Sequence, residues 1–186
     1  MLKEVDASEN RALPYVVRIA LRTGMRLNEI MRLRWHDIEF HKDHALILVK
    51  KTKNKRQRFV PLVGDALEAV VRLKVPRGDA FSEELLFPSK TKPKKPVLIR
   101  ASWNTCLNKA DIKLFRFHDL RHTLASRLAG QNFSLPRIGN VLGHVDHRST
   151  LIYTHFASDD AVQMVAQSAK ASAEAIAKLN STSTSN

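Results

Sequence analysis

The sequence predicts a mainly α-helical domain with a small antiparallel β-sheet, an α+β fold. Apolar residues recur at helical spacing over most of the 186 residues. Between residues 37 and 62 the apolar period changes to two, the period of strands with one buried face. A chain of this length can bury the core of one compact domain, so we expect a single domain over residues 1–179.

The first predicted helix covers residues 10–22, where the apolar side chains share one face. Thr23 and Gly24 end this helix, and a second helix begins at Leu27. Arg26 therefore lies near a helix start, directly after a glycine turn.

Two apolar runs, ALILV and RFVPL, flank the very polar stretch KKTKNKRQ. Both runs are rich in β-branched or aromatic residues, which favour strands. The pattern predicts a small antiparallel sheet with a basic hairpin. Residues 64–74 return to helical spacing, and a loop rich in Pro and Lys follows over residues 75–96.

The second half of the chain predicts helices over residues 101–110, 118–129 and 135–142. The expected buried stripe of the middle helix consists of Leu120, Leu124 and Leu128. Gly130 ends this helix. Ser134 can cap the next helix, with Pro136 tolerated in its first turn and Gly143 as its stop.

The C-terminal part, residues 158–179, is Ala-rich and predicted to be helical, and residues 180–186 form a polar tail that we expect to be disordered. Two arrangements of the helical segment remain open. It packs on its own domain, or it docks on a neighbouring copy of the chain.

The charge of the chain points to a polyanionic partner. Lys and Arg number 31 against 18 Asp and Glu, which gives a net charge of +13 and a pI of about 10.2. Such a surface concentrates nucleic acid first and anionic membrane surfaces second. The basic residues are spread along the sequence, which disfavours a simple polybasic tail.

The sequence shows no apolar run long enough to cross a bilayer and no evident signal peptide. The single cysteine, Cys106, cannot form an intramolecular disulfide and is expected to be a small core residue in a reducing cytosol. We therefore expect a cytoplasmic protein without a membrane partner.

Several polar residues have ordinary explanations when each is taken alone. Arg26 could be a solvated residue at a helix start, and Lys53 could belong to a solvated hairpin tip. His118 and His122 lie four apart on a predicted helix, the spacing of a zinc pair. Arg121 would place a cation beside that metal, and no Glu follows His118, so no metal is predicted.

Together these residues suit phosphoryl chemistry. Two arginines can clamp phosphate oxygens through paired hydrogen bonds, and histidines can donate to the same oxygens. A lysine can protonate a leaving alkoxide, and a tyrosine can supply the nucleophile.

This constellation resembles the tyrosine recombinase (phage integrase) family. The resemblance rests on four ordered segments: TGMRLNEIMRLRWHDI at residues 23–38, KTKNKRQRFVPL at 51–62, HDLRH at 118–122 and LGHVDHRSTLIYTH at 142–155. It implies the DNA breaking-rejoining catalytic fold of that family and a bacterial or phage-derived host.

The resemblance also implies roles for individual residues. The catalytic set would be Arg26, Lys53, His118, Arg121, His144 and the nucleophile Tyr153. Supporting residues would be Glu29, His122 and His155. Candidate contacts to the DNA backbone are Lys51, Lys55, Arg56, Lys92, Lys94 and Lys95.

In the implied mechanism Tyr153 attacks a DNA phosphodiester and forms a 3′-phosphotyrosine with a free 5′-hydroxyl. His118 is the candidate acceptor of the tyrosine proton, and Lys53 would protonate the leaving oxygen. No metal, ATP or other cofactor is implied. Site-specific recombination for integration, excision or resolution is the expected activity. Type IB topoisomerase-like relaxation, a non-catalytic DNA-binding module and a zinc-binding regulator remain alternatives.

Members of this family usually carry a separate N-terminal core-binding domain, and here residues 1–22 alone precede the TGMR segment. We therefore expect the chain to be the catalytic domain without that core-binding domain. The resemblance implies double-stranded DNA as partner, a homotetramer on DNA for the full-length protein, and a location in the bacterial nucleoid.

Overall fold

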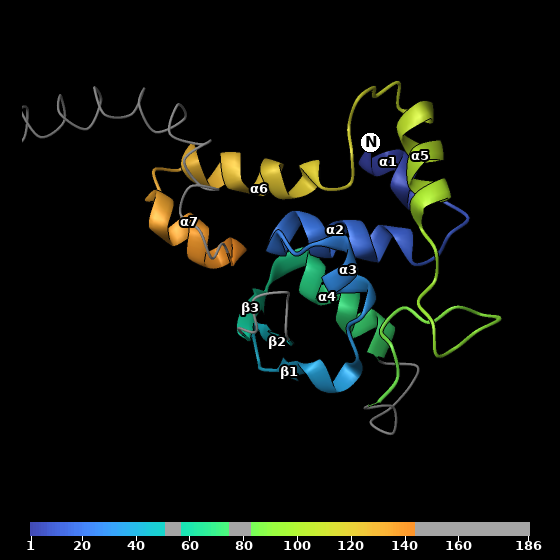
Figure 1. Ribbon diagram of the computed structural model, residues 1–186, viewed down its shortest axis with the longest axis horizontal. Helices are drawn as coiled ribbons and strands as arrows, with labels where there is room; N and C mark the ends of the chain where they lie inside the picture. The colour runs from blue at the N-terminus through green and yellow to red at the C-terminus, as the bar shows by residue number, and fades with distance from the viewer. Residues whose placement is uncertain (51–56, 75–82, 144–186) are drawn as a thin grey trace, which may run out of the picture.

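The computed structural model describes residues 1–50, 57–74 and 83–143 (Figure 1). The helices are α1 (Leu2–Asp6), α2 (Leu13–Thr23), α3 (Leu27–Met31), α4 (Gly64–Lys74), α5 (Arg100–Lys109), α6 (Asp119–Ala129) and α7 (Leu135–Leu142). A short 3₁₀ helix, η1, covers Trp35–Asp37. The strands are β1 (Ile38–Phe40), β2 (Ala45–Val49) and β3 (Arg58–Leu62).

The three strands form one antiparallel sheet in the order β1-β2-β3. Ile47 of β2 faces Ile38 of β1 and Val60 of β3, and all three side chains are buried. This cross-strand row forms the inner face of the sheet, as expected for strands with alternating apolar residues. The predicted antiparallel sheet is confirmed.

Helix α2 lies at the centre of the fold. It packs against α6 on one side and α4 on the other, and it also contacts α1, α3 and β3 (Figure 1). Its apolar residues are almost completely buried, as shown by Leu13, Val16, Val17 and Ile19. Because α2 is packed on several sides, the segment that follows its C-terminal end is held in a defined position.

Two groups of buried side chains form the core. The larger one joins α2, the sheet, α4 and α5, and the smaller one lies between α6 and α7. The smaller cluster consists of Leu124, Ala125, Ala129, Ile138 and Leu142. Cys106 is buried in the larger cluster, where its thiol contacts the Glu4 carbonyl at 3.2 Å, so its predicted place in the core is confirmed. Within the described residues, no helix has the length and apolar character needed to span a membrane.

Most predicted elements agree with the structure, with three differences. Helix α1 was not predicted, because five residues are too few for an apolar period to show. Ser134 occupies the cap position of α7, but its side chain makes no capping hydrogen bond. Leu128 is only half-buried, and Arg121 and Ala125 are buried on α6 instead. A buried arginine on an apolar helix face requires polar partners. Those of Arg121 are two backbone carbonyls in the candidate site.

Candidate active site

The turn after α2 is the centre of the site. Gly24 has φ 63°, in the left-handed region that glycine adopts readily, and it ends α2 as the sequence predicts. The buried hydroxyl of Thr23 donates to the Ile19 carbonyl at 2.5 Å and accepts the Met25 amide at 3.2 Å. This pair of hydrogen bonds links the last turn of α2 to the segment that carries Arg26.

Arg26 is the residue at the N-terminal cap of α3, where its backbone is extended. Its amide donates to Glu29 Oε2 at 2.9 Å, one half of a capping box. Its guanidinium lies 3.4 Å from Glu29 Oε1 and remains 45% exposed. Glu29 therefore holds Arg26 at the surface through both backbone and side chain.

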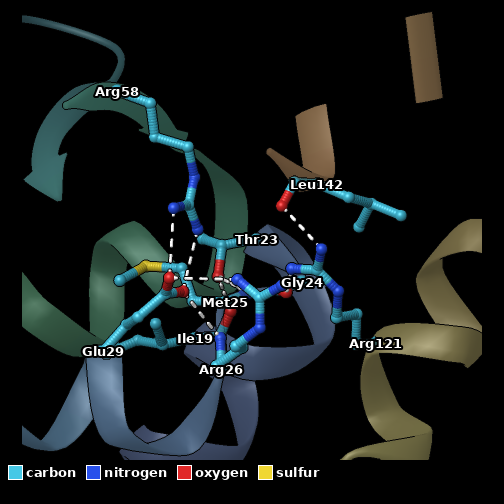
Figure 2. A network of polar contacts seen from close by, with 9 residues as sticks. All are labelled: Ile19, Thr23, Gly24, Met25, Arg26, Glu29, Arg58, Arg121 and Leu142. Carbon is cyan, nitrogen blue, oxygen red and sulfur yellow. Dashed lines mark hydrogen bonds and ion pairs between the residues drawn. The ribbon is translucent and has the colours of Figure 1, made fainter. Parts of the chain in front are cut away.

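Arg121 on α6 is only 3% exposed and donates two short hydrogen bonds to backbone carbonyls. One bond goes to Gly24 and the other to Leu142, each at 2.7 Å (Figure 2). The guanidinium plane is therefore fixed by carbonyls of two segments that are far apart in the sequence. Arg121 joins the turn after α2, helix α6 and the end of α7.

The close packing at this junction depends on Gly24. A Cβ atom built there would lie 2.5 Å from Leu142 Cδ2 and 3.2 Å from Leu124 Cδ2. A side chain at this position would push α7 and α6 away from the turn. Because Arg121 binds across the same junction, its position also depends on that glycine.

Glu29 has a second partner, which is not among the predicted site residues. Arg58 at the start of β3 donates to Glu29 Oε1 at 3.1 Å and to Oε2 at 2.8 Å. Burial by itself raises the pKa of Glu29, but the hydrogen bonds from Arg58 and the Arg26 amide, with both arginine charges, hold it below its ordinary value of 4.5. Glu29 is therefore a carboxylate at neutral pH.

Arg58 could have been found by strand periodicity. In β3 it lies two residues before Val60 and four before Leu62, both of which are buried. The period of two places Arg58 on the same inner face.

His118 lies directly before α6, and its ring meets that of His122 edge to face with the centroids 5.1 Å apart. His118 is exposed overall, but partial burial of the imidazole lowers its pKa below 6.5. The neighbouring imidazole of His122 and the guanidinium groups of Arg121 and Arg26 act in the same direction, and Asp119 opposes them. The neutral imidazole is thus favoured at pH 7, the form that can accept a proton.

The structure brings five of the predicted residues into one region through these contacts. They are Arg26, Glu29, His118, Arg121 and His122. The predicted residues Lys51, Lys53, Lys55, Arg56, His144, Tyr153 and His155 lie outside the described residues.

Three predicted DNA contacts lie in another part of the described chain. Lys92, Lys94 and Lys95 are exposed in the loop before α5, which is closed by the bridge between Pro88 and Pro96. In Figure 1 this loop and α7 lie at opposite ends of the molecule. The structure therefore does not bring these lysines together with Arg26 and Arg121, and their role as DNA contacts stays a prediction.

The chemistry available at this site is the binding of an oxyanion. Two guanidinium groups and the His118–His122 pair come together around the turn after α2. Two carbonyls fix the guanidinium of Arg121, and that of Arg26 lies 3.4 Å from the Glu29 carboxylate. Fixed arginines match the oxygens of a phosphate. Among residues 1–50, 57–74 and 83–143, no group of three His, Cys, Asp or Glu side chains is arranged to hold a metal ion.

Comparison with known proteins identifies the class. The phage integrase family matches residues 1–180, and the chain belongs to this family. The expected family is therefore confirmed.

Similar proteins include named tyrosine recombinases and integrases. The chain is 31% identical over 136 residues to the tyrosine recombinase XerC of Xanthomonas axonopodis pv. citri, covering 72% of this chain and 43% of that protein. It is 31% identical over 155 residues to the integrase of Salmonella phage P22, covering 78% of this chain and 39% of that protein. The chain thus spans less than half the length of these two relatives.

Solved structures show the same fold. The catalytic domain of bacteriophage HP1 integrase matches with a TM-score of 0.62 and 27% identity, and the match covers 87% of each chain. A XerH site-specific recombinase bound to its palindromic difH substrate matches with a TM-score of 0.70 and 23% identity, covering 88% of this chain and 49% of that one. The predicted tyrosine recombinase catalytic fold is confirmed.

Proposed function

We propose that this chain is the catalytic domain of a site-specific DNA recombinase that cleaves and rejoins DNA through a 3′-phosphotyrosine. The observation that supports this most is the placement of Arg26 and Arg121 together at the turn formed by Gly24, in a chain of the phage integrase family. Two arginines held in this way suit the nonbridging oxygens of one phosphodiester, where negative charge increases during phosphoryl transfer.

The chemical step uses residues of this chain alone. The Tyr153 oxygen attacks phosphorus and forms a new phosphorus–oxygen bond, while its proton passes to neutral His118. The bond from phosphorus to the 5′ oxygen breaks, and that oxygen takes a proton from Lys53. The reverse sequence rejoins the strand, so no ATP is consumed and no metal is required. His144 would donate to the phosphoryl oxygens, with His122 and His155 in support.

Tyr153 needs a positive environment to react at neutral pH, because a free tyrosine has a pKa of about 10. The net charge of +13 and the nearby arginines supply this environment and attract DNA. The proposed partner is double-stranded DNA, contacted also by the hairpin residues Lys51, Lys55 and Arg56.

The relatives also support a proposal for the domain extent, the location and the assembly of the protein. The XerH structure is a recombinase bound to its DNA substrate in a post-cleavage complex. We propose that residues 1–179 form one catalytic domain, that it acts in the bacterial cytoplasm, and that the full-length recombinase works as a homotetramer on DNA.

The test is covalent capture of DNA. The purified chain is mixed with supercoiled plasmid and with nicked duplex in EDTA at low salt and then quenched with SDS. The parent should give relaxed plasmid and a protein–DNA adduct, and Tyr153→Phe should give neither. An adduct that persists with Tyr153→Phe would refute the assignment of the nucleophile.

The same assay separates the alternative functions. Relaxation without strand exchange between two duplexes would favour a type IB topoisomerase activity. DNA binding without an adduct under any of these conditions would favour a non-catalytic DNA-binding module. A requirement for added zinc would contradict the metal-independent mechanism.

A further inference from the structure

We propose that Arg58 is a positioning residue of this site, which holds Glu29, and through it Arg26, in a fixed relation to β3 and to the end of α7. The inference rests on the proposed function, because it assigns Arg58 to the same phosphate site. Arg58 would act through Glu29 and would not touch the reacting phosphate.

The Arg58–Glu29 pair is both bidentate and buried. The two hydrogen bonds measure 3.1 and 2.8 Å, and the side chains are 17% and 9% exposed. Among the arginine–carboxylate pairs of the described residues it is the least exposed. The pair of Arg18 and Asp6 has similar bidentate geometry but is 27% and 47% exposed.

Stability alone is a poor explanation for such a pair. The cost of removing two charges from water offsets much of their attraction when the pair is buried. The Arg58 Nε is also buried and makes no hydrogen bond among the described residues, which adds to the cost. Apolar pairs of similar size often stabilise such a position equally well, so the specific benefit of this ion pair is the geometry that it imposes.

The imposed geometry reaches Arg26 through one carboxylate. Oε2 of Glu29 accepts from Arg58 Nη2 and also from the Arg26 backbone amide. Oε1 accepts from Arg58 Nη1 and lies 3.4 Å from Arg26 Nη1. A rotation of the Glu29 carboxylate would therefore displace both the backbone and the guanidinium of Arg26 (Figure 2).

Arg58 also contacts the other side of the site at Gly143. A Cβ atom built on Gly143 would lie 2.6 Å from both Cδ and Nε of Arg58 and 3.0 Å from Cζ. The Arg58 side chain thus passes directly against the backbone that ends α7. Leu142, the residue before this glycine, supplies the carbonyl bound by Arg121. Arg58 therefore contacts Glu29, which binds Arg26. It also contacts the end of α7, where the Leu142 carbonyl binds Arg121.

The experiment compares Arg58→Met and Arg58→Lys with the control Arg18→Met. Methionine keeps much of the side-chain volume without the charge, and lysine keeps the charge without the bidentate geometry. Arg18→Met breaks a bidentate arginine–carboxylate pair outside the site. All variants are compared at equal folded fraction, measured by thermal unfolding.

The first measurement follows the Glu29 carboxyl and the Arg26 amide by NMR during a pH titration. In Arg58→Met the Glu29 midpoint should rise by about one pH unit or more, because a desolvated carboxylate has lost its strongest donor. The Arg26 amide should shift with the same midpoint. Midpoints that are equal in the parent and Arg58→Met would overturn the proposal, whatever happens with DNA.

The second measurement separates DNA affinity from the rate of adduct formation at saturating DNA. Both Arg58 variants should form adduct about tenfold more slowly or worse, since small displacements of catalytic groups are costly, while their affinity for nicked duplex changes less than about twofold. Arg18→Met should match the parent in both. Adduct rates that equal the parent's, or that fall only with the folded fraction, would overturn the positioning role.

A parent that forms no adduct would refute the proposed function and not this inference. The NMR titration would then decide whether Arg58 holds Glu29 and Arg26. Should Arg58→Met not fold, Arg58→Lys provides the same titration, with an expected rise of the Glu29 midpoint because a single ammonium nitrogen cannot reproduce the bidentate geometry of the guanidinium.

Discussion

Arg121 combines deep burial with two backbone acceptors, and this combination defines its role in the molecule. Its guanidinium spans the carbonyls of Gly24 and Leu142 because the two terminal nitrogens of arginine lie in one rigid plane. Lysine carries its donors on a single nitrogen and cannot reproduce two donor nitrogens held apart in one rigid plane. The residue proposed to bind phosphate is thus also a structural link between α2, α6 and α7.

We therefore expect Arg121→Lys to lower both stability and activity. One buried carbonyl would lose its partner, which costs about 1–3 kcal/mol of unfolding free energy. Urea unfolding measures this loss, and Arg127→Lys is the control, since Arg127 lies on α6 but is exposed. Equal stability of the two variants would show that the two carbonyl bonds do not support the fold.

At the scale of single elements, the C-terminal end of α2 positions the segment that carries Arg26. The Thr23 hydroxyl bonds the carbonyl one turn earlier and the amide of buried Met25. This hydroxyl therefore determines how the chain leaves the helix before it reaches Arg26.

Thr23→Val keeps the shape of the side chain but removes both bonds. Because the Met25 amide would be left buried without this acceptor, we expect a loss of about 1–3 kcal/mol and a slower adduct reaction. Thr105→Val in α5 is a matched control, since its hydroxyl also bonds a carbonyl four residues earlier but is exposed. That change should cost less than about 0.5 kcal/mol. A Thr23→Val protein as stable as the control would contradict the argument, and urea unfolding makes the comparison.

The elements themselves were largely predictable because their signals are local. Glycine at the left-handed ends of α2 and α7 and the period-two runs of the sheet gave the boundaries within a few residues. The partners of Arg58 and Arg121 were not predictable in this way. Each depends on contacts between residues distant in the sequence, such as Arg121 with Gly24, which no local pattern contains.

The site residues illustrate the same limit. Arg26, His118 and Arg121 were identified by motif, yet the motif alone does not reveal that Arg121 is buried or that Glu29 serves two arginines. Buried polar groups are stabilised by their tertiary partners, so their roles become visible only when the fold is known.

The folding stability of the whole molecule should depend on pH through two groups of the site. The folded pKa of His118 lies below 6.5 and that of Glu29 below 4.5. In both cases the unfolded chain binds the proton at a higher pH than the folded chain. The stability that each group contributes is therefore complete above its ordinary pKa and is lost as the pH falls through its folded pKa.

Urea unfolding of the parent and His118→Gln from about pH 8 to about pH 5 tests the pH dependence that His118 contributes. The difference in unfolding free energy between the two proteins should be constant at high pH. Below pH 6.5 the parent should lose stability relative to His118→Gln. A difference that does not change with pH would show that His118 titrates alike in the folded and unfolded chains.

The two carbonyls that Arg121 binds have a further consequence for the electrostatics of the molecule. Both lie at C-terminal ends of helices, α2 and α7, where aligned peptide dipoles place about half a negative elementary charge each. The single positive charge of Arg121 is therefore opposed by roughly equal dipole charge. A neutral residue at this position would leave both helix ends without a counter-charge, which would lower the positive potential of the proposed phosphate site.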